Sequence, residues 1–225
     1  MIKQLYRIYR QKYRFPILLV LGAIAFTLTL TFNSAVHAKL FDGPVDRLPL
    51  EQRVALRHGE VIFLGKGGEY TCRVLATSSI ENAWQVLTDY ENFADFLPGV
   101  ESSQLVEEKG DFKVFEQINK IKALLFSIES RIQIANTEVY PQEIAFEAVE
   151  GEDLEYLEGK WTLEPVSPYP SAPPDRVLMT HKVTVKPANA ISDGIFYSIY
   201  EDRLRETMTA IGLETEQRYS RISQE

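Results

Sequence analysis

The middle of the chain is a succession of short runs in which apolar and polar residues alternate, and this pattern restricts the fold more than any other feature. In residues 127–134, SIESRIQI, isoleucine or serine occupies each even position and a polar residue each odd one. Leu157, Gly159, Trp161 and Leu163 share one face of a later run in the same way. Because strand side chains point alternately to two faces, consecutive runs of this kind predict an antiparallel sheet with one face in water.

The pattern places one strand at residues 69–76 and two more on either side of the turn EKGD at 108–111. Four further strands follow at 127–134, 143–151, 155–165 and 176–187. GKGG at 65–68 predicts a turn between two strand-like runs, and it lacks the spacing and the following helix of a phosphate loop. The Pro-rich segment 165–175 is expected to be an exposed, mobile loop.

Two short helices are predicted between the first long strand and the others. Ser78 and Glu81 have the spacing of a capping box. The apolar residues of the first helix recur at helical spacing, and those of the second share a face before Pro98-Gly99 ends it. These residues are Ile80, Trp84 and Leu87, followed by Phe93, Phe96 and Leu97.

A long amphipathic helix is predicted at the end of the chain, beginning near Ser192. Its apolar positions are Phe196, Tyr200, Leu204, Met208 and Ile211, and acidic and basic residues occupy the opposite face. Such a helix has to lie across the sheet, which makes the layout α+β. A further helical stretch is expected to open at Pro49, with Leu50, Val54 and Leu56 as its apolar positions, and to close near Gly59.

The first 38 residues have the pattern of an export signal. Five basic residues and no acid precede the apolar run 15–32, and NSAVHA then offers a small-x-small cleavage site that ends at Ala38. We favour cleavage there, but an uncleaved membrane anchor competes, since 18 apolar residues lie at the lower limit for spanning a bilayer. Either outcome places the rest of the chain outside the cytoplasm, in a periplasm or lumen.

Charge and cysteine content exclude some classes of function. Residues 39–225 hold 19 basic against 32 acidic side chains, and so acidic a body repels phosphate backbones, which argues against nucleic-acid binding. Cys72 is the single cysteine, so no disulfide can form within the chain, and its place in an alternating run predicts a small buried residue.

The order of these elements, together with two motifs, resembles a known superfamily. The motifs are W-x-x-L-x-D-Y-x-N-x-x-x-F-L-P from Trp84 to Pro98, and the run of Gly151, Gly159 and Trp161. The chain is similar to the polyketide cyclase/dehydrase and lipid-transport group of the START-like (SRPBCC) superfamily, close to the coenzyme Q-binding START-domain proteins. This resemblance covers residues 61–218 and implies a helix-grip fold, in which a curved antiparallel sheet wraps around the C-terminal helix and encloses a deep apolar cavity.

The chain then divides into a signal or anchor (1–38), a linker and short arm (39–60), the helix-grip domain (61–218) and a tail (219–225). The residues expected to line the cavity, and equally able to serve as plain core, are Trp84, Phe93, Phe96, Leu97, Trp161, His181, Phe196, Tyr200, Leu204 and Met208. His181 shares a face with Met179, Val183 and Val185, and we favour a core histidine bonded to a neighbour over a ligand contact. The alternation around Gln117 and Asn119 does not settle which way they face.

We expect the domain to bind an apolar small molecule, a quinone, isoprenoid or lipid, and to carry or shield it near a membrane. A membrane surface is a further candidate partner, and KALLF at 122–126 fits either a bilayer contact or a buried hairpin segment. No cofactor, metal or catalytic residue is indicated: adjacent Asp89 and Tyr90 do not face each other on a helix, and the acidic stretch 150–158 favours a solvated face over a calcium loop. A cyclase or dehydratase acting on a polyketide-like or aromatic substrate, and a protein-interaction module with a closed core, are the alternatives.

Overall fold

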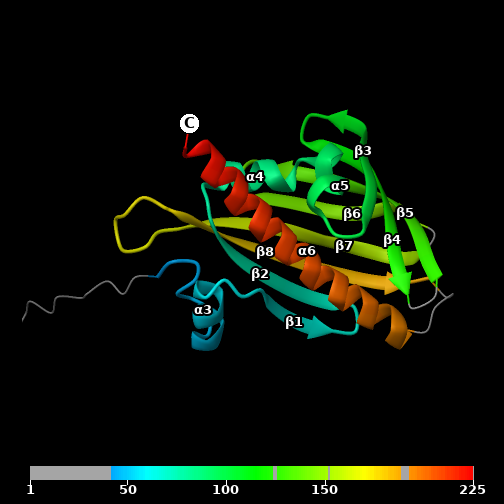
Figure 1. The fold of residues 1–225 in the computed structure, drawn as a ribbon, viewed down its shortest axis with the longest axis horizontal. Coiled ribbons are helices and arrows are strands. Elements are labelled where there is room, and N and C mark those ends of the chain that lie inside the picture. Colours follow the sequence, from blue (N-terminus) through cyan, green and yellow to red (C-terminus); the bar gives the residue numbers. More distant parts are fainter. Residues whose placement is uncertain (1–41, 124–125, 152, 189–192, 225) are drawn as a thin grey trace, which may run out of the picture. The chain divides into compact units, whose positions relative to one another are not determined.

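The computed structural model describes residues 42–123, 126–151, 153–188 and 193–224 (Figure 1). The predicted signal or anchor lies outside these residues, and so does the centre of KALLF. The described part is α+β, with one antiparallel sheet and a long C-terminal helix, as the alternation and the terminal amphipathic pattern predict.

The sheet has eight strands in the order β1-β2-β8-β7-β6-β5-β4-β3, and every neighbouring pair is antiparallel. Strands β3 to β8 follow one another as a meander. The last of them, β8, pairs with β2, so that segments far apart in the sequence become neighbours. The strands are β1 (Ile62–Lys66), β2 (Glu69–Thr77), β3 (Val100–Lys109), β4 (Phe112–Ala123), β5 (Phe126–Val139), β6 (Glu143–Gly151), β7 (Leu154–Val166) and β8 (Arg176–Pro187).

Three short helical segments connect β2 to β3: α4 (Ile80–Leu87), η1 (Tyr90–Asn92) and α5 (Phe93–Phe96). The capping prediction is wrong by one residue, because Ser79 rather than Ser78 accepts the hydrogen bond from the Asn82 N–H, at 3.2 Å. Ser78 is instead buried, and its Oγ accepts a hydrogen bond from the Asn82 side chain at 2.8 Å. The same amide group donates to the Thr215 carbonyl at 2.8 Å, which ties α4 to the last helix.

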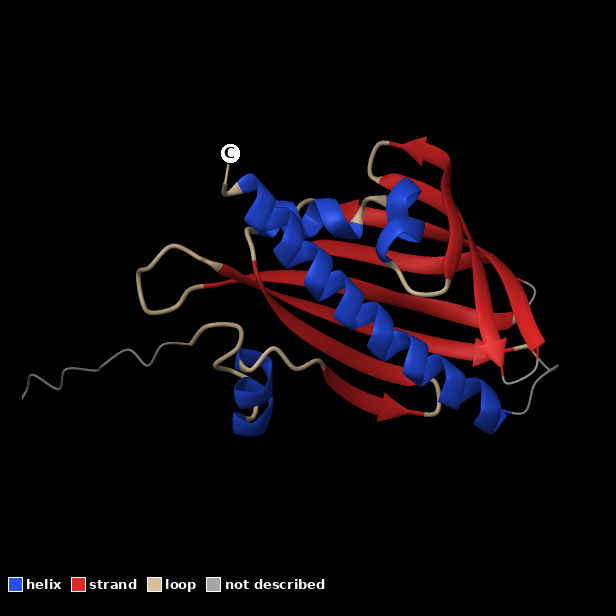
Figure 2. Ribbon diagram, viewed as in Figure 1, coloured by secondary structure: helices blue, strands red, loops and turns tan. Residues whose placement is uncertain are grey.

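The long helix α6 (Asp193–Ile222) crosses one face of the sheet (Figure 2). Leu204, Met208 and Ile211 are buried against the sheet, in the main hydrophobic cluster of the described residues. At Gly212 the helix comes so close to β2 that a Cβ atom would lie 2.8 Å from Val74 Cγ2. The C-terminal half of α6 is therefore its anchor on the sheet, and the helix continues to Ile222, into the predicted tail.

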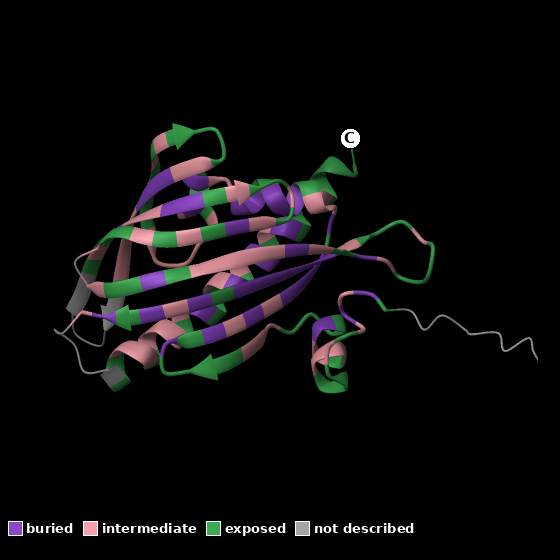
Figure 3. Ribbon diagram, turned by 180° about the vertical axis from the view of Figure 1, so that it is seen from behind, coloured by how far each residue is buried: buried purple, intermediate pink, exposed green. Residues whose placement is uncertain are grey.

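Helix α3 (Leu50–Arg57) confirms the predicted helical stretch, but its apolar set is only partly right. Leu56 is 1% exposed, whereas Leu50 and Val54 are 64% and 46% exposed. Leu56 packs with Leu75 and Leu178, which alternate along β2 and β8 with the residues that face α6. The arm therefore covers one end of the sheet face opposite α6, and Figure 3 shows that face with buried and exposed residues alternating along the strands.

Gly159 allows β7 to fit between its neighbours and an aromatic ring. A Cβ atom at this position would lie 2.1 Å from the Lys182 carbonyl oxygen and 2.5 Å from Phe146 Cζ. Phe146 is the cross-strand partner of Gly159, so its ring covers the position where the glycine has no side chain.

We predict that Gly159→Ala destabilises the protein by roughly 1–3 kcal/mol, because either the backbone of β8 or the Phe146 ring has to move. Gly151→Ala is the matched control, since a Cβ there would lie 3.5 Å from Ile132 Cγ1, an ordinary contact. Denaturant unfolding of both variants measures the difference. Equal stability of the two would show that the sheet has room at Gly159.

Candidate functional site: a two-chamber cavity under helix α6

An inner chamber of about 230 Å³ lies between the sheet and α6. Most of its wall is apolar or aromatic, and its polar residues are Tyr90, Gln117, Asn136, His181, Tyr200, Arg203 and Thr207. The apolar lining residues come from α4, from α5 and the residue after it, from four strands and from α6: Leu87, Phe93, Leu97, Phe115, Ile134, Ile144, Phe146, Leu157, Trp161, Leu204 and Ile211.

An outer chamber of about 290 Å³ continues from the inner one toward the first turns of α6. The two share Leu97, Gln117, Ile134, Leu157, Tyr200, Arg203 and Thr207 in their linings. The outer wall adds Phe196 and Ile199 from the helix and Asn119, Ser130 and Asp153 from the sheet side. The combined space falls in the size range of small-molecule sites, which are mostly apolar with a few polar groups.

The predicted cavity residues divide into two groups. Those that lie on the chamber walls are Phe93, Leu97, Trp161, His181, Phe196, Tyr200 and Leu204. Trp84, Phe96 and Met208 are on neither wall. Helical spacing identifies the buried face of a segment, but it does not distinguish residues that meet a neighbouring side chain from residues that meet an empty space.

The contacts of these three residues explain their positions. Trp84 packs edge-on against Tyr140, with 5.4 Å between ring centroids. Phe96 lies against Phe93 at 5.8 Å, and the Arg218 guanidinium lies 5.3 Å from its ring. Met208 is fully buried within the core cluster.

Several wall residues were beyond the reach of the sequence. Gln117 lines both chambers and Asn119 the outer one, so both face the cavity on the same side of β4 as Phe115. Lys113 to Glu116 are all largely buried, so buried and exposed residues do not alternate along this part of the strand. Arg203 and Thr207 also line both chambers, although neither is apolar and neither was among the predicted cavity residues.

His181 is 7% exposed and lies between two aromatic rings. Its ring stacks on Phe146 with 5.2 Å between centroids, and the Trp161 ring centroid is 4.2 Å away. Within the described residues its Nδ1 has no hydrogen-bond partner, so ring contacts replace the expected bond to a neighbour. Burial lowers the pKa of His181 to about 3, and the imidazole is therefore neutral at physiological pH.

Tyr90 is held by a buried hydrogen-bond network. Its hydroxyl donates to Glu138 Oε1 at 2.5 Å and accepts from Asn136 Nδ2 at 3.0 Å, and burial raises its pKa. The neighbouring Asp89 instead forms an ion pair with Arg218 at 2.7 Å. Asp89 and Tyr90 thus have separate partners.

Tyr200 and Cys72 are the other groups with reactive potential near the cavity. The Tyr200 ring stacks on Tyr70 and Phe196, with centroids 5.7 and 5.8 Å away, and burial raises the pKa of its hydroxyl. Cys72 is fully buried, and burial raises the pKa of its thiol to about 12. Both groups therefore hold their protons tightly, and neither is an activated nucleophile.

The described residues hold no cluster of three or more His, Cys, Asp or Glu side chains able to bind a metal ion. The acidic stretch predicted as a solvated face includes Glu155, which pairs with Lys186 at 2.8 Å.

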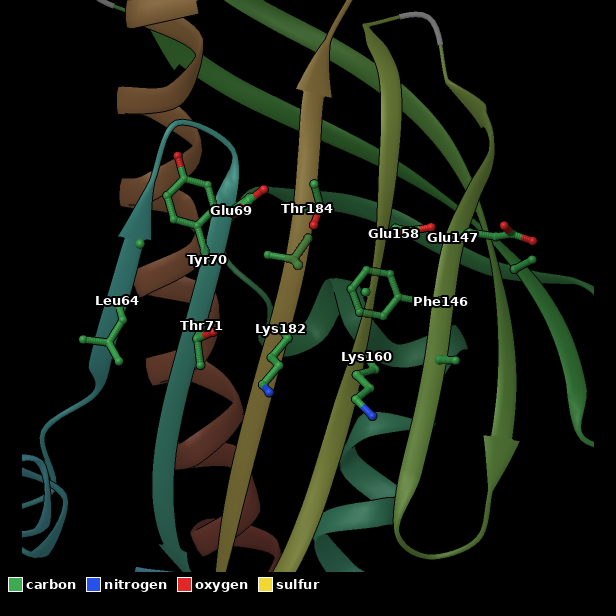
Figure 4. Close-up of a pocket in the computed structure, with 15 residues that line it drawn as sticks. Leu64, Glu69, Tyr70, Thr71, Phe146, Glu147, Glu158, Lys160, Lys182 and Thr184 are labelled. Atoms are coloured by element: carbon green, nitrogen blue, oxygen red, sulfur yellow. The ribbon is translucent and has the colours of Figure 1, made fainter. Parts of the chain in front are cut away.

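A second, larger depression of about 790 Å³ lies over the sheet itself, and Figure 4 shows its labelled residues on β1, β2, β8, β7 and β6. Its charged residues alternate along the strands with residues that face α6: Lys182, for example, lies between His181 and Val183. Lys160 forms an ion pair with Glu143 at 2.8 Å. This depression is the solvated face of a twisted sheet, and its wall is far more charged than that of the inner chamber.

These features define a class of protein: a helix-grip domain with an apolar cavity between its sheet and its C-terminal helix. The family model of polyketide cyclase/dehydrase and lipid transport proteins matches residues 78–211, more than half of the chain. The chain belongs to this family. A search of curated protein sequences finds no significant match.

Solved structures share the fold. A START superfamily protein from Mycobacterium smegmatis is 13% identical with a TM-score of 0.55, over 69% of this chain and 99% of that chain. The Zhui aromatase/cyclase from Streptomyces sp. R1128 is 14% identical with a TM-score of 0.54, over 73% and 96%. A STAR-related lipid transfer protein from Xanthomonas axonopodis is 16% identical with a TM-score of 0.53, over 70% and 92%. Identities this low demonstrate the START-like fold alone.

We predict that His181 makes the stability of the protein depend on pH. Its pKa is about 3 when folded against an ordinary value of 6.5, so the unfolded state binds more protons between these limits. As the pH falls below about 6.5, this residue lowers the free energy of unfolding by up to about 1.4 kcal/mol per pH unit. Denaturant unfolding of the wild type and His181→Phe between about pH 7 and pH 4.5 isolates the contribution. Parallel pH curves for the two proteins would contradict the prediction.

Proposed function

We propose that the domain binds an apolar small molecule, a quinone, isoprenoid or lipid, within the two chambers and carries it or shields it from water. The observation that carries this proposal is the continuous apolar cavity between the sheet and α6. Membership of a family that includes lipid transport proteins supports it, as does the likeness to a STAR-related lipid transfer protein.

Burial of apolar surface supplies the binding free energy in this proposal. Each methylene group moved from water into an apolar wall contributes about 0.8 kcal/mol. A chain of about ten carbons therefore gains enough to offset the loss of translational freedom on binding, with little help from polar groups.

A cyclase or dehydratase is the second candidate, and the shared fold of the Zhui aromatase/cyclase favours it. Such chemistry requires groups that exchange protons near the operating pH. In the described part of the cavity, His181 has its pKa lowered to about 3, and Tyr90 is engaged with Glu138 and Asn136. These groups suit binding better than proton transfer. The interaction module with a closed core is the weakest candidate, since the core is open at the chambers.

We also propose that the domain works outside the cytoplasm, tethered to a membrane or released from it. The basic and apolar pattern of residues 1–38 supports this location. Among the described residues, no helix combines the length and apolar character needed to cross a membrane.

Native mass spectrometry of the full chain, purified from its own membranes and followed by lipid extraction, tests the proposal. A bound quinone, isoprenoid or acyl lipid in near-stoichiometric amount is expected. A protein that is purified without a ligand and also takes up none of these molecules when they are supplied would overturn the proposal. The other candidate functions would then be favoured.

We predict that Thr207→Trp blocks the cavity. Thr207 lines both chambers at their junction, so an indole there fills the passage and weakens uptake of an apolar ligand by about tenfold or more. Thr209→Trp is the matched control, because Thr209 is exposed on the same helix and lines neither chamber. Ligand occupancy by native mass spectrometry and thermal unfolding are measured for both. Equal occupancy in the two variants would place the ligand elsewhere.

A further inference from the structure

Polar side chains without partners gather where the two chambers meet. Gln117, Tyr200 and Thr207 line both chambers, and Asn119 and Ser130 line the outer one. Among the described residues, none of these side chains is recorded in a hydrogen bond with another part of the protein. All five are only partly buried, so their polar groups are free to bond with a molecule that enters the cavity.

Arg203 is the cation at this junction, and it lines both chambers from α6. Its Nη1 donates to Glu206 Oε2 at 2.8 Å, which leaves the other N–H groups of the guanidinium for a second partner. The guanidinium also lies against Gly99, where a Cβ atom would be 3.3 Å from Nη1. With 34% of its side chain exposed, Arg203 reaches from the cavity to water.

The charge of the cavity wall is opposite in sign to that of the chain. The sequence holds 32 acidic against 24 basic residues. Among its described lining residues the inner chamber has Arg203 and no carboxylate, and the outer chamber adds Lys120 and Arg131 with a single acid, Asp153. Lys120 and Arg131 line the outer chamber alone, whereas Arg203 lines both chambers and is therefore the cation placed to meet a ligand that occupies both.

We infer that the ligand is an amphipathic anion, whose carboxylate or phosphate head binds Arg203 and the neighbouring amide groups while its apolar part fills the inner chamber. This inference rests on the proposed binding function and specifies the class of ligand. The guanidinium fork matches two oxygens of a carboxylate or phosphate. Gln117 and Asn119 on β4 offer further N–H donors from the opposite wall.

Tryptophan fluorescence tests the inference, because Trp161 is on the wall of the inner chamber. The full chain is placed in phosphatidylcholine vesicles and titrated at about pH 8 with decanoic acid, decyl phosphate, decanol and decylamine, below their micelle-forming concentrations. We expect the two anions to bind about tenfold to a hundredfold more tightly than decanol, and decylamine to bind most weakly. The two anionic probes also distinguish a carboxylate head from a phosphate head.

Variants at Arg203 complete the test. Arg203→Gln is expected to remove the preference for anions, so that decanoic acid and decanol bind with similar affinity. Arg203→Lys is expected to restore the preference in part, since lysine keeps the charge without the planar fork of the guanidinium. Arg205→Gln is the control, because Arg205 lies over the Phe63 ring and lines neither chamber.

The outcomes separate this inference from the proposed function. Equal binding of decanol and decanoic acid by the wild type, or a preference that survives Arg203→Gln, would overturn the anionic ligand and leave an apolar carrier. Failure of every probe to bind would count against the proposed function as well.

Discussion

The anchoring of the C-terminal half of α6 on β2 is the contact on which the rest of the described structure depends. At Gly212 the missing side chain lets the helix approach Val74 closely, and Met208 and Thr215 are completely buried nearby. The Asn82 amide then ties α4 to the Thr215 carbonyl. Between this anchor and the first turns of the helix the side chains do not fill all the space above the sheet, and the two chambers remain.

That space is the cavity, and its position explains the two kinds of residue along α6. From Leu204 onward the helix contributes buried apolar side chains to the core. Before Leu204 its cavity-facing residues are only partly buried, and Phe196, Tyr200 and Arg203 border the chambers. A single amphipathic pattern therefore supplies both core packing and cavity wall, and Leu204 and Ile211 contribute to both.

The fold could be predicted from the sequence because period-two alternation and a long amphipathic helix are local signals with few structural solutions. Prediction of the site was incomplete for a physical reason. Trp84 and Phe93 have the same helical spacing and burial, yet only Phe93 borders a chamber. Which buried residue borders empty space depends on the curvature of the sheet and the angle of α6. For Gln117 even the face of the strand to which it points was hidden, because apolar and polar residues do not alternate regularly along β4.

The same burial that shapes the cavity restricts its chemistry. Enclosure between Phe146 and Trp161 removes the charge of His181, and enclosure against Tyr70 and Phe196 keeps the Tyr200 hydroxyl protonated. Groups that neither gain nor lose protons near neutral pH make poor acids and bases, but they remain competent for hydrogen bonding. A wall that combines such groups with apolar rings supports the carrier function that we propose over the cyclase or dehydratase.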